Sequence, residues 1–535
     1  MQKLELTWIG KGQEPAVEPR ILLHDASRDY GAPDATNMLI HGDNLLALKA
    51  LEQEFAGRVK CVYIDPPYNT GSAFEHYDDG IEHSIWLGLM KSRLDILRDL
   101  LSNEGMLFIQ IDNRELHYLK LVCDEVFGRQ NFRNQIIVKK GTKNVSVQFD
   151  TVERLNAGYD TILMYSKNSA LRIPNLFVET SDEENVGSWN NHWRGTDRPT
   201  MRYELFGITP ENGQWRWAKE RTQKAVDNYE LLQPYLSLHG IDENDQSSFD
   251  GAYLRYLKEY SIADVKDFQL VRLSRRGKPE HYIPPSNKKL LSENWLDLSV
   301  AGRQTDFEHE KNEFILQRII EWVTHPGDLV LDSFLGSGTT TAVAHKMGRR
   351  YIGIELGDHC YTHCLPRLKA VVDGEQGGIS KTVDWKGGGG FKFYELAPTL
   401  IEKDENGFEI ISEKYDATML AAAVAKLCGY RFAPREGNPY VHGVNNVGGF
   451  IFVTTQYITA PLLGEIAKNF SDTQSLVICA SAFQVGIKNN FPNIKLRKIP
   501  QSVLAKCEYG AENYNLNVVE LPEFEETEED FEDAE

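Results

Sequence analysis

The stretch from Val59 to Tyr68 limits the possible folds of this chain more than any other stretch. Its apolar, β-branched run, which includes Val62 and Ile64, predicts a buried strand. The run ends in two prolines, which cannot continue a sheet. An acid, two rigid residues and an aromatic ring are therefore presented at the carboxyl end of a strand. In open α/β sheets, that edge is where ligands bind.

The loop that follows this strand, Asp65-Pro66-Pro67-Tyr68, suits one kind of ligand. The prolines fix φ at about −65° and remove two backbone donors, which leaves carbonyl acceptors pointing outward. A carboxylate only accepts hydrogen bonds, and a tyrosine ring stacks. A flat heterocycle with an exocyclic amino group fits, with its ring on Tyr68 and its amine between Asp65 and the Pro66 carbonyl. The alternative for an isolated match is a turn ahead of a surface aromatic residue.

A second motif, centred on Gly336 and Gly338, again predicts a strand, a glycine turn and a helix. The glycines permit positive φ and close approach of the backbone to a ligand, and Thr339 or Thr340 is expected to cap the helix. The spacing matches neither the dinucleotide fingerprint nor a phosphate-binding loop. The next strand ends in Glu355. In nucleoside-binding α/β folds, such an acid accepts hydrogen bonds from ribose hydroxyls. One such junction is common in α/β proteins, but two matched loops are not.

Together the two loops resemble the signatures of DNA amino-methyltransferases: Asp-Pro-Pro-Tyr, and the Phe-x-Gly-x-Gly loop that holds S-adenosylmethionine. Because the first loop precedes the second by about 270 residues, the chain resembles the circularly permuted β class. The phrases 63–71, 132–134 and 307–318 are similar to the Mod subunit of type III restriction-modification systems. The resemblance implies an α/β fold: a Rossmann-like, doubly wound methyltransferase domain with an inserted target-recognition domain and a separate C-terminal α+β domain.

The resemblance also implies which residues form the site. The implied catalytic residues are Asp65, Pro66, Pro67 and Tyr68. The implied cofactor-binding residues are Asp43, Asp65, Asp332, Phe334, Gly336, Ser337, Gly338, Thr339, Glu355 and Lys311. A surface helix N-cap is the alternative for Asp43, and an ordinary surface lysine is the alternative for Lys311. The family usually has Lys-Pro where this chain has Lys311-Asn312, which leaves open how the following helix begins.

The implied reaction is site-specific methyl transfer from S-adenosylmethionine to N6 of an adenine flipped out of duplex DNA. In the resembling family, Asp in the first loop goes mostly with adenine and Ser mostly with cytosine N4. No Pro-Cys motif points to carbon-5 methylation, and no metal is required. The alternatives are a solitary methyltransferase for adenine N6 or cytosine N4, an RNA or protein-glutamine methyltransferase, and a recognition subunit acting mainly through a helicase-nuclease. The type III resemblance implies a homodimer and a Res helicase-nuclease partner.

The region 170–305 interrupts the alternation of strands and helices and is the expected target-recognition insert. Tryptophans and basic residues are interleaved there, a combination that can grip phosphates and pack against bases. The expected DNA contacts are Arg194, Arg198, Arg202, Arg272, Arg275, Arg276 and Lys278, with a basic loop at 275–278. The alternative is an α+β insert whose tryptophans form its own core. We expect mostly core tryptophans and mostly DNA-contacting basic residues.

Composition and apolar periodicity suggest the remaining organisation. We expect an irregular N-terminal arm at 1–35, a catalytic half at 36–169, a cofactor-binding half at 306–375, a Gly-rich linker at 376–390, a C-terminal domain at 391–515 and an acidic tail at 516–535. The C-terminal domain is predicted to contain a helix at 417–427 and strands at 450–454 and 476–480. This domain and the tail are either partner-binding parts or independently packed ones.

The net charge of −20 argues at first against a nucleic-acid partner. Ten acids and no base lie between Glu520 and Glu535, so half of the imbalance belongs to the tail. Any DNA contact must therefore come from local basic patches. No apolar run approaches the ~20 residues that a membrane span needs.

Seven scattered cysteines suggest reduced thiols and a cytoplasmic protein. One cluster, His359, Cys360, His363 and Cys364, has pairs four residues apart that share a helix face and can chelate zinc. No second pair at ligand spacing accompanies them. Buried small residues are the favoured interpretation, and we expect no metal.

Overall fold

The fold is described from a computed structural model of the chain. The described residues are 5–12, 17–18, 20–68, 73–74, 77–78, 83–140, 157–179, 185–196, 198–243, 245–298, 310–403, 405, 409–487 and 491–499. The predicted acidic tail and the predicted domain's last residues, 500–515, lie outside them. No helix in the described part of the chain is long and apolar enough to cross a membrane.

An 11-stranded mixed sheet is the largest element of the fold. In spatial order its strands are β1 (Leu22–His24), β20 (Gly390–Leu396), β3 (Met38–His41), β19 (Arg350–Glu355), β18 (Leu329–Asp332), β4 (Val59–Ile64), β7 (Leu101–Ile111), β9 (Tyr159–Ser166), β8 (Phe132–Lys139) and β17 (Asn294–Trp295), and β2 (Tyr30–Gly31) also pairs with β20. The six strands from β20 to β7 are parallel, as the alternation of strands and helices predicts. β9 runs antiparallel to both β7 and β8.

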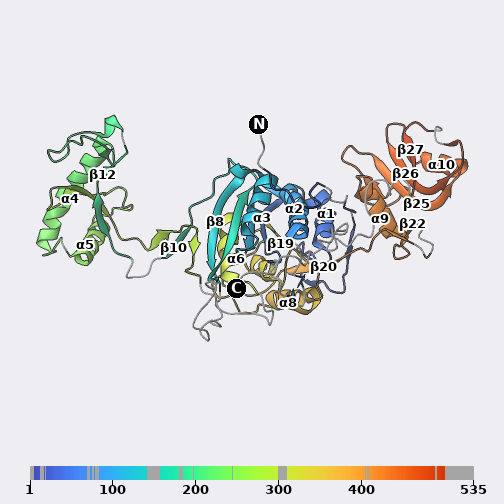
Figure 1. Cartoon of the computed structure of the whole chain (residues 1–535), viewed down its shortest axis with the longest axis horizontal. Coiled ribbons are helices and arrows are strands. Elements are labelled where there is room, and N and C mark those ends of the chain that lie inside the picture. Colours follow the sequence, from blue (N-terminus) through green and yellow to red (C-terminus); the bar gives the residue numbers. More distant parts are fainter. Residues whose placement is uncertain are drawn as a thin grey trace, which may run out of the picture. The chain divides into compact units, whose positions relative to one another are not determined.

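Six helices accompany the parallel strands, so the α/β prediction is confirmed. They are α1 (Asn44–Phe55), α2 (His83–Leu100), α3 (Leu116–Cys123), α6 (Glu313–Val323), α7 (Thr339–Lys346) and α8 (Leu365–Val372). In Figure 1, blue, cyan and gold elements interleave in the central sheet, which shows that segments far apart in the sequence build it. The apolar face of α2, with Met90, Leu94 and Leu97, is fully buried in the sheet's main core.

The direction of winding reverses between β18 and β4. From β18 the chain passes through α7 to β19, whereas from β4 it passes through α2 to β7, in the opposite direction along the sheet. Because such crossovers are almost always right-handed, α7 and α2 cover opposite faces. Open α/β sheets bind ligands in the crevice at the carboxyl ends of strands where winding reverses. The loops after β18 and β4 are the two that the sequence singled out.

The edge of the sheet next to β3, formed by β20, β1 and β2, differs from the sequence prediction. The expected irregular arm at 1–35 contains β1 and β2, and both pair antiparallel with β20. β20 extends the parallel sheet beside β3, so the sheet continues past residue 391, the predicted start of the C-terminal domain. β20 forms a strand because burial alternates along it: Phe391 and Phe393 are buried, and Lys392 between them is less so.

The expected Gly-rich linker at 376–390 is folded, which also differs from the prediction. Trp385 Nε1 donates to the Val371 carbonyl at 2.7 Å, and the Gly388 amide donates to the Val372 carbonyl at 2.7 Å. Ile379 is fully buried. The glycines of this segment therefore serve close packing against α8 and not a free connection.

The chain divides into two compact units, residues 1–174 with 293–535, and residues 175–292. The second unit corresponds to the predicted insert at 170–305. It contains α4 (Lys219–Leu238), α5 (Gln246–Glu259), a three-stranded sheet of β11 (Ser188–Asn191), β15 (Pro279–Ile283) and β14 (Val271–Leu273), and two ribbons, β12 (Trp193–Arg194) with β13 (Gln214–Trp215) and β10 (Phe177–Glu179) with β16 (Lys288–Leu290).

The C-terminal residues belong to the first unit, although the sequence predicted a separate domain. They do form a sheet of their own, β23 (Arg431–Phe432), β24 (Gly443–Val444), β25 (Phe450–Ile458), β26 (Leu476–Phe483) and β27 (Ile494–Lys498), a β21–β22 pair (Ile401–Lys403 and Glu409–Ile411), and two helices, α9 (Ala417–Leu427) and α10 (Ala460–Ala467). The predicted helix and both predicted strands are thus confirmed. Ile21 shares a core with the residues of α9, which ties these elements to the N-terminal segment.

Candidate active site

The loop after β4 brings its acid and its aromatic ring together. The Tyr68 hydroxyl donates to Asp65 Oδ1 at 2.7 Å. The buried side chain of Trp86, from α2, holds the loop by donating from Nε1 to the Pro67 carbonyl at 2.7 Å. Since Pro66 and Pro67 have no amide hydrogen, the loop leaves few backbone donors to satisfy. Asp65 and Tyr68 form one rigid unit at the carboxyl end of a buried strand.

Lys311 contacts this loop, whereas the sequence placed it among the cofactor-binding residues. Its Nζ lies 2.8 Å from Asp65 Oδ2 and 2.9 Å from the Tyr68 hydroxyl oxygen. It also lies 4.9 Å from the centroid of the Tyr68 ring. The position follows from α6, which packs against β4 and begins two residues after Lys311. Lys311 is therefore a partner of Asp65, the expected catalytic acid, and not an ordinary surface lysine.

Asn312 settles how α6 begins. It is the N-cap, and its Oδ1 accepts a hydrogen bond from the Phe314 amide at 2.8 Å. Its φ of −71° is one that proline also adopts. The residue that replaces the family's usual proline thus keeps the same backbone direction and adds a cap.

The glycine loop after β18 is held by Asp332. Asp332 Oδ1 accepts from the Phe334 amide at 2.9 Å, and Oδ2 accepts from the Thr340 hydroxyl at 2.5 Å. Gly336 and Gly338 have φ of +58° and +83°, which few other residues adopt without strain. The prediction that Thr339 or Thr340 caps α7 is wrong. Gly338 is the N-cap without a side-chain bond, because Thr340 turns to Asp332.

Glu355 lies next to the glycine loop, as the sequence predicted. Its Oε2 accepts from the Gly336 amide at 2.6 Å, and its Oε1 accepts from the Leu356 amide at 2.8 Å and the Gly357 amide at 3.2 Å. The side chain is almost fully buried. Glu355 therefore fixes the loop after β18 to the end of β19. Whether it also accepts from a ribose stays a prediction.

The carboxylates on this edge lie close enough to affect one another. Burial, and to a lesser degree the neighbouring charges of Asp65 and Glu355, raise the pKa of Asp332 to about 7, against the two hydrogen bonds that lower it. Burial, and then the charge of Asp65, also raises the pKa of the Tyr68 phenol well above its usual value. Tyr68 is therefore a neutral donor throughout the physiological range, and Asp332 interacts electrostatically with both Asp65 and Glu355 along this edge.

Asp43 caps a helix and contacts a buried cation. Its side chain accepts from the Leu46 amide at 2.9 Å, so Asp43 is the N-cap of α1, and its expected contact with the cofactor stays a prediction. Arg93, buried in α2, lies 3.4 Å from Asp43 Oδ2 and also donates to Asn44 Oδ1. Asn44 Nδ2 in turn donates to the Ser333 carbonyl at 2.7 Å, next to Asp332. These two residues, which sequence reasoning missed, join the start of α1 to the glycine loop.

A second set of polar side chains beside Tyr68 was also missed. Lys140, which follows β8, has its Nζ 5.3 Å from the Tyr68 ring centroid and 2.8 Å from Asp160 Oδ1. Gln110 Nε2 donates to Asp160 Oδ2 at 3.2 Å and its Oε1 accepts from the Tyr63 hydroxyl at 2.6 Å. The only signal in the sequence is polar residues within otherwise apolar strands, which does not reveal their partners.

Comparison with known proteins decides the family. A family model described as "DNA methylase", of the N6/N4 methyltransferase type, matches residues 59–364. This is more than half of the chain, and it includes both loops and Glu355. The chain belongs to this DNA methylase family.

Relatives of this chain that have curated names include the following three. The "Probable type III restriction-modification enzyme HindVI Mod subunit" of Haemophilus influenzae is 34% identical over 69% of this chain and 55% of its own length. The type II methyltransferase M.EcaI of Enterobacter cloacae is 27% identical over 66% of this chain and 72% of its own length. The EcoP15I Mod subunit of Escherichia coli is 24% identical over 76% and 73%. The chain thus spans about half the length of the Haemophilus relative.

Solved structures also resemble this DNA methylase. The M1.HpyAVI–SAM complex is 15% identical, with a TM-score of 0.32, over 62% of this chain and 98% of that one. The cytosine-N4-specific PvuII DNA methyltransferase is 12% identical, with a TM-score of 0.33, over 69% of this chain and 94% of that one.

The predicted DNA contacts fall into two groups within the insert. Arg194, Arg198, Arg275, Arg276 and Lys278 are exposed, the last three on the tight turn that joins β14 to β15. Arg202 and Arg272 are instead partly buried and have partners within the insert. Arg202 donates to the Gly213 and Glu211 carbonyls, and Arg272 lies 3.9 Å over the Trp189 ring and within 3.7 Å of two glutamates. These contacts hold both arginines within the insert, and their expected role in DNA binding stays a prediction.

The tryptophans of the insert are mostly core, as expected. Trp215 is buried, and Trp189 packs against Phe249 and Tyr282. Trp193 is the exception: it is 39% exposed and lies next to Arg194. A partly exposed aromatic ring beside an exposed arginine is the interleaving that the sequence predicted for a DNA-facing surface.

The His-Cys cluster after β19 has internal partners. His359 Nε2 lies 2.9 Å from Glu355 Oε1, and the Cys364 thiol donates to the Gly336 carbonyl at 3.0 Å. Cys360 is buried. Across the described residues, no group of three or more His, Cys, Asp or Glu side chains could hold a metal ion. The contacts support the glycine loop.

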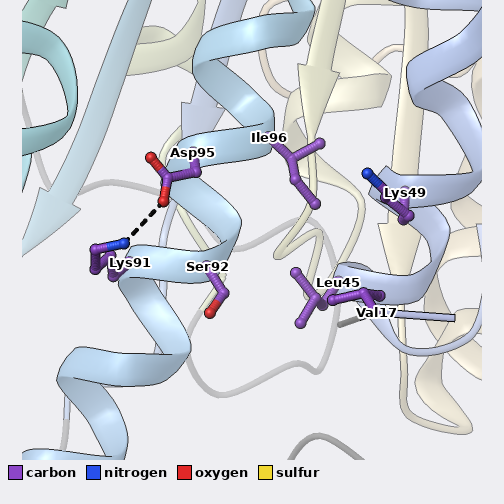
Figure 2. Close-up of a pocket in the computed structure, with 7 residues that line it drawn as sticks. All are labelled: Val17, Leu45, Lys49, Lys91, Ser92, Asp95 and Ile96. Carbon is purple, nitrogen blue, oxygen red and sulfur yellow. Dashed lines mark hydrogen bonds and ion pairs between the residues drawn. The ribbon is translucent and has the colours of Figure 1, made fainter. Parts of the chain in front are cut away.

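A pocket of about 200 Å³ lies between α1 and α2 (Figure 2). Leu45 and Lys49 line it from α1, and Lys91, Ser92 and Asp95 line it from α2. None of the predicted site residues lines it. It is separate from the edge at which the two loops meet.

Proposed function

We propose that this chain transfers a methyl group from S-adenosylmethionine to the exocyclic N6 amine of adenine at a specific site in duplex DNA. The observation that carries the proposal is the position of two loops. The Asp65–Tyr68–Lys311 cluster and the glycine loop leave neighbouring strands, β4 and β18, at the point where winding reverses. One loop suits an amine and the other suits a nucleoside, so the same edge can hold both reactants.

The residues on this edge fit S-adenosylmethionine, which is a cation. Asp332, Glu355 and Asp65 are close enough to influence one another, and such a group of carboxylates favours positive charge. Gly336 and Gly338, with positive φ, permit close approach of the backbone. We expect these residues, with Phe334 and Asp43, to hold the cofactor. When bound, S-adenosylmethionine supplies a methyl group that its sulfonium already activates.

Asp65 positions the amine. An ionised carboxylate has about four acceptor positions. Tyr68 and Lys311 use one position on each oxygen, so each oxygen can accept a further bond. A hydrogen bond from the adenine amine to Asp65, and another to the Pro66 carbonyl, would localise the nitrogen lone pair that the ring otherwise delocalises. Positioning and electrostatics can then supply most of the rate enhancement.

Tyr68 supplies the ring on which a flipped base stacks. Its raised pKa keeps the phenol neutral, and its hydroxyl is tied to Asp65, so the ring cannot turn freely. The cationic nitrogens of Lys311 and Lys140 lie 4.9 and 5.3 Å from the ring centroid. We infer that these two lysines set the ring's orientation.

Adenine is favoured over cytosine by the identity of the loop's acid. In the family that the sequence resembles, Asp at this position goes mostly with adenine. One relative, 22% identical over 62% of this chain, is named DNA adenine methyltransferase YhdJ of Escherichia coli. Cytosine N4 is the second candidate, because the family model covers both amines.

We further propose that the chain is the modification and specificity subunit of a type III restriction-modification system, with a Res helicase-nuclease as partner and a homodimer as its own assembly. The support is that several relatives are named Mod subunits of type III enzymes. Size-exclusion chromatography with light scattering tests the homodimer. Co-purification with the product of a neighbouring helicase-nuclease gene tests the partner.

A competition assay tests the methyltransferase proposal. Duplex DNA from a methylation-deficient bacterium, RNA and a protein extract are offered together with S-adenosylmethionine labelled in the methyl group. We expect label in DNA alone with the wild-type chain, and none with Asp65→Asn. Label in RNA or protein, or label in DNA that Asp65→Asn leaves unchanged, would contradict the proposal.

A further inference from the structure

A buried arginine in α8, Arg367, contacts the glycine loop through one of its terminal nitrogens. Its Nη1 donates to the Ser337 carbonyl at 3.3 Å, to the Ser337 hydroxyl at 3.2 Å and to the Thr339 hydroxyl at 3.0 Å. Ser337 and Thr339 are themselves buried. Because both are residues of the loop that we expect to hold the cofactor, the contacts with Arg367 fix the position of that loop.

The other terminal nitrogen of Arg367 contacts the start of α6. Nη2 lies 2.8 Å from Glu313 Oε1 and 2.8 Å from Glu310 Oε1. The side chains of both glutamates are almost fully buried. They flank Lys311, whose Nζ lies on Asp65 and Tyr68. A single guanidinium therefore joins the cofactor loop to the segment that carries the catalytic acid's partner.

We propose that Arg367 is a positioning residue that holds the cofactor loop and Lys311 in one fixed relation. Cofactor affinity and the alignment of Asp65 then depend on the same side chain. This inference rests on the proposed function and adds to it a residue that acts through the glycine loop and through the segment that carries Lys311.

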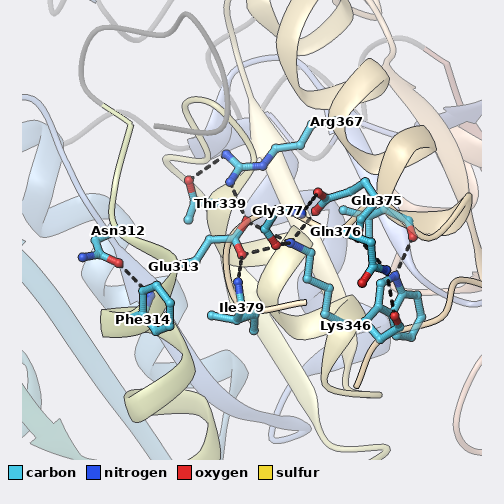
Figure 3. Close-up of polar contacts among 12 residues, drawn as sticks. Asn312, Glu313, Phe314, Thr339, Lys346, Arg367, Glu375, Gln376, Gly377 and Ile379 are labelled. Atoms are coloured by element: carbon cyan, nitrogen blue, oxygen red, sulfur yellow. Dashed lines mark hydrogen bonds and ion pairs between the residues drawn. The ribbon is translucent and has the colours of Figure 1, made fainter. Parts of the chain in front are cut away.

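Glu313 is held in place by further polar contacts, which Figure 3 shows. Besides Arg367, its carboxylate accepts from Lys346 at 2.9 Å and from the Ile379 amide at 3.0 Å. Gly378 packs so closely that a β-carbon there would lie 2.0 Å from Glu313 Oε2. The glutamate cannot swing away when Arg367 is altered, so a change at Arg367 must be taken up by the glycine loop or by residues 310–311.

Arginine suits this role better than lysine would. The planar guanidinium directs its two terminal nitrogens to different partners at fixed angles, whereas a lysine ammonium is a single point charge on a flexible stem. Arg367→Lys keeps the buried positive charge, so the net charge of the network is unchanged, but one ammonium cannot reach the loop and both glutamates at once. This substitution separates positioning from charge.

Lys346 provides the matched control. It is a buried cation on α7 that pairs with Glu313 and Glu375, in the same network (Figure 3). Its contacts within the described residues are with Glu313, Glu375 and the Gly377 carbonyl, and they do not include Ser337, Thr339 or Glu310. When Lys346 is replaced, Glu313 keeps its contacts with Arg367 and the Ile379 amide, so Lys346→Met should lower the unfolding temperature while leaving the relation between the glycine loop and Lys311 intact.

The experiment measures cofactor affinity by calorimetry, kcat at saturating cofactor with methylation-deficient DNA, and the unfolding temperature, for each full-length variant. The wild-type chain comes first, because a wild type that neither binds S-adenosylmethionine nor methylates DNA refutes the proposed function itself. We expect Arg367→Lys to weaken cofactor affinity and to lower kcat, each by about tenfold or more. We expect Lys346→Met to change both by less than about threefold.

The inference is overturned if Arg367→Lys leaves both cofactor affinity and kcat near the wild-type values, or if it changes only one of the two. It is also overturned if Lys346→Met changes both quantities as much as Arg367→Lys does. If Arg367→Lys does not fold, Glu310→Gln tests the same connection by weakening only the arm to Lys311. It should lower kcat with little effect on cofactor affinity, and an unchanged kcat would refute the inference.

Discussion

Replacing Lys311 by methionine tests the largest difference between the sequence prediction and the structure. The sequence places Lys311 with the cofactor, and the structure places its Nζ 2.8 Å from Asp65 Oδ2 and 2.9 Å from the Tyr68 hydroxyl. Methionine keeps the length of the side chain and removes the charge and both hydrogen bonds. The expected loss is therefore in the methyl-transfer step and not in cofactor binding.

The size of the effect follows from the contacts. A hydrogen bond between charged groups contributes about 1.5–3 kcal/mol, and a neutral one about 1 kcal/mol. The side chains of Lys311 and Asp65 are 19% and 21% exposed, so solvent screens the pair in part and the lower end of the range applies. A total of about 2–3 kcal/mol corresponds to a roughly 30- to 150-fold lower kcat, if the full interaction is needed in the transition state.

The assay measures single-turnover methyl transfer to methylation-deficient DNA at saturating S-adenosylmethionine, together with calorimetric cofactor affinity. Lys91→Met is the matched control, because Lys91 pairs with Asp95 on α2, in the wall of the separate pocket. It should leave kcat unchanged. A Lys311→Met variant with wild-type kcat and a tenfold weaker cofactor affinity would refute the structural assignment and restore the sequence-based one.

Three further predictions concern the catalytic loop and the insert. Tyr68→Phe keeps the ring and removes its hydrogen bond to the catalytic acid, so kcat should fall about tenfold while DNA affinity holds; equal losses in both would contradict separate roles. Replacing Arg275 and Arg276 by serine should reduce the salt dependence of DNA binding by a slope of about 2, whereas Lys266→Ser, 82% exposed elsewhere on the insert, should not. Burial, and to a lesser degree a neighbouring arginine, lowers the pKa of His281 to about 4, so the insert gains stability from neutral His281 above pH 6.5 and loses it as pH falls toward 4. The loss due to His281 is up to about 2 kcal/mol at pH 5 and should be missing in His281→Gln, which keeps only the contribution of His192, whose pKa burial lowers to about 3. Chemical unfolding measures it, and a pH profile that the substitution leaves unchanged would refute the prediction.

Local patterns in the sequence predict the fold well where burial is periodic. The helix at 417–427 and the strands that begin at 450 and 476 all appear as expected. The edge of the sheet is different, because pairing there joins segments more than 350 residues apart. β20 looks like the end of a Gly-rich linker in sequence, and only its partner β3 reveals it as a strand.

The site shows the same limit for long side chains. Motif spacing places Asp65, Gly336 and Glu355 at strand ends, and the structure brings their strands together. Motif spacing does not tell where the charged end of a lysine or arginine side chain lies. Lys311 reaches the catalytic loop, Arg272 folds back over Trp189, and Arg275 is exposed, although the sequence treats both arginines alike. Polar partners of buried residues, such as Arg367, leave no periodic signal at all.

The most direct test of the central claim is the identity of the methylated nucleoside. The purified full-length chain is incubated with S-adenosylmethionine and methylation-deficient duplex DNA, and the digested DNA is analysed by mass spectrometry. The shared edge of β18 and β4 predicts N6-methyldeoxyadenosine, which Asp65→Asn abolishes. Methyl groups on cytosine alone, or no methylated base with a chain that binds the cofactor, would contradict it.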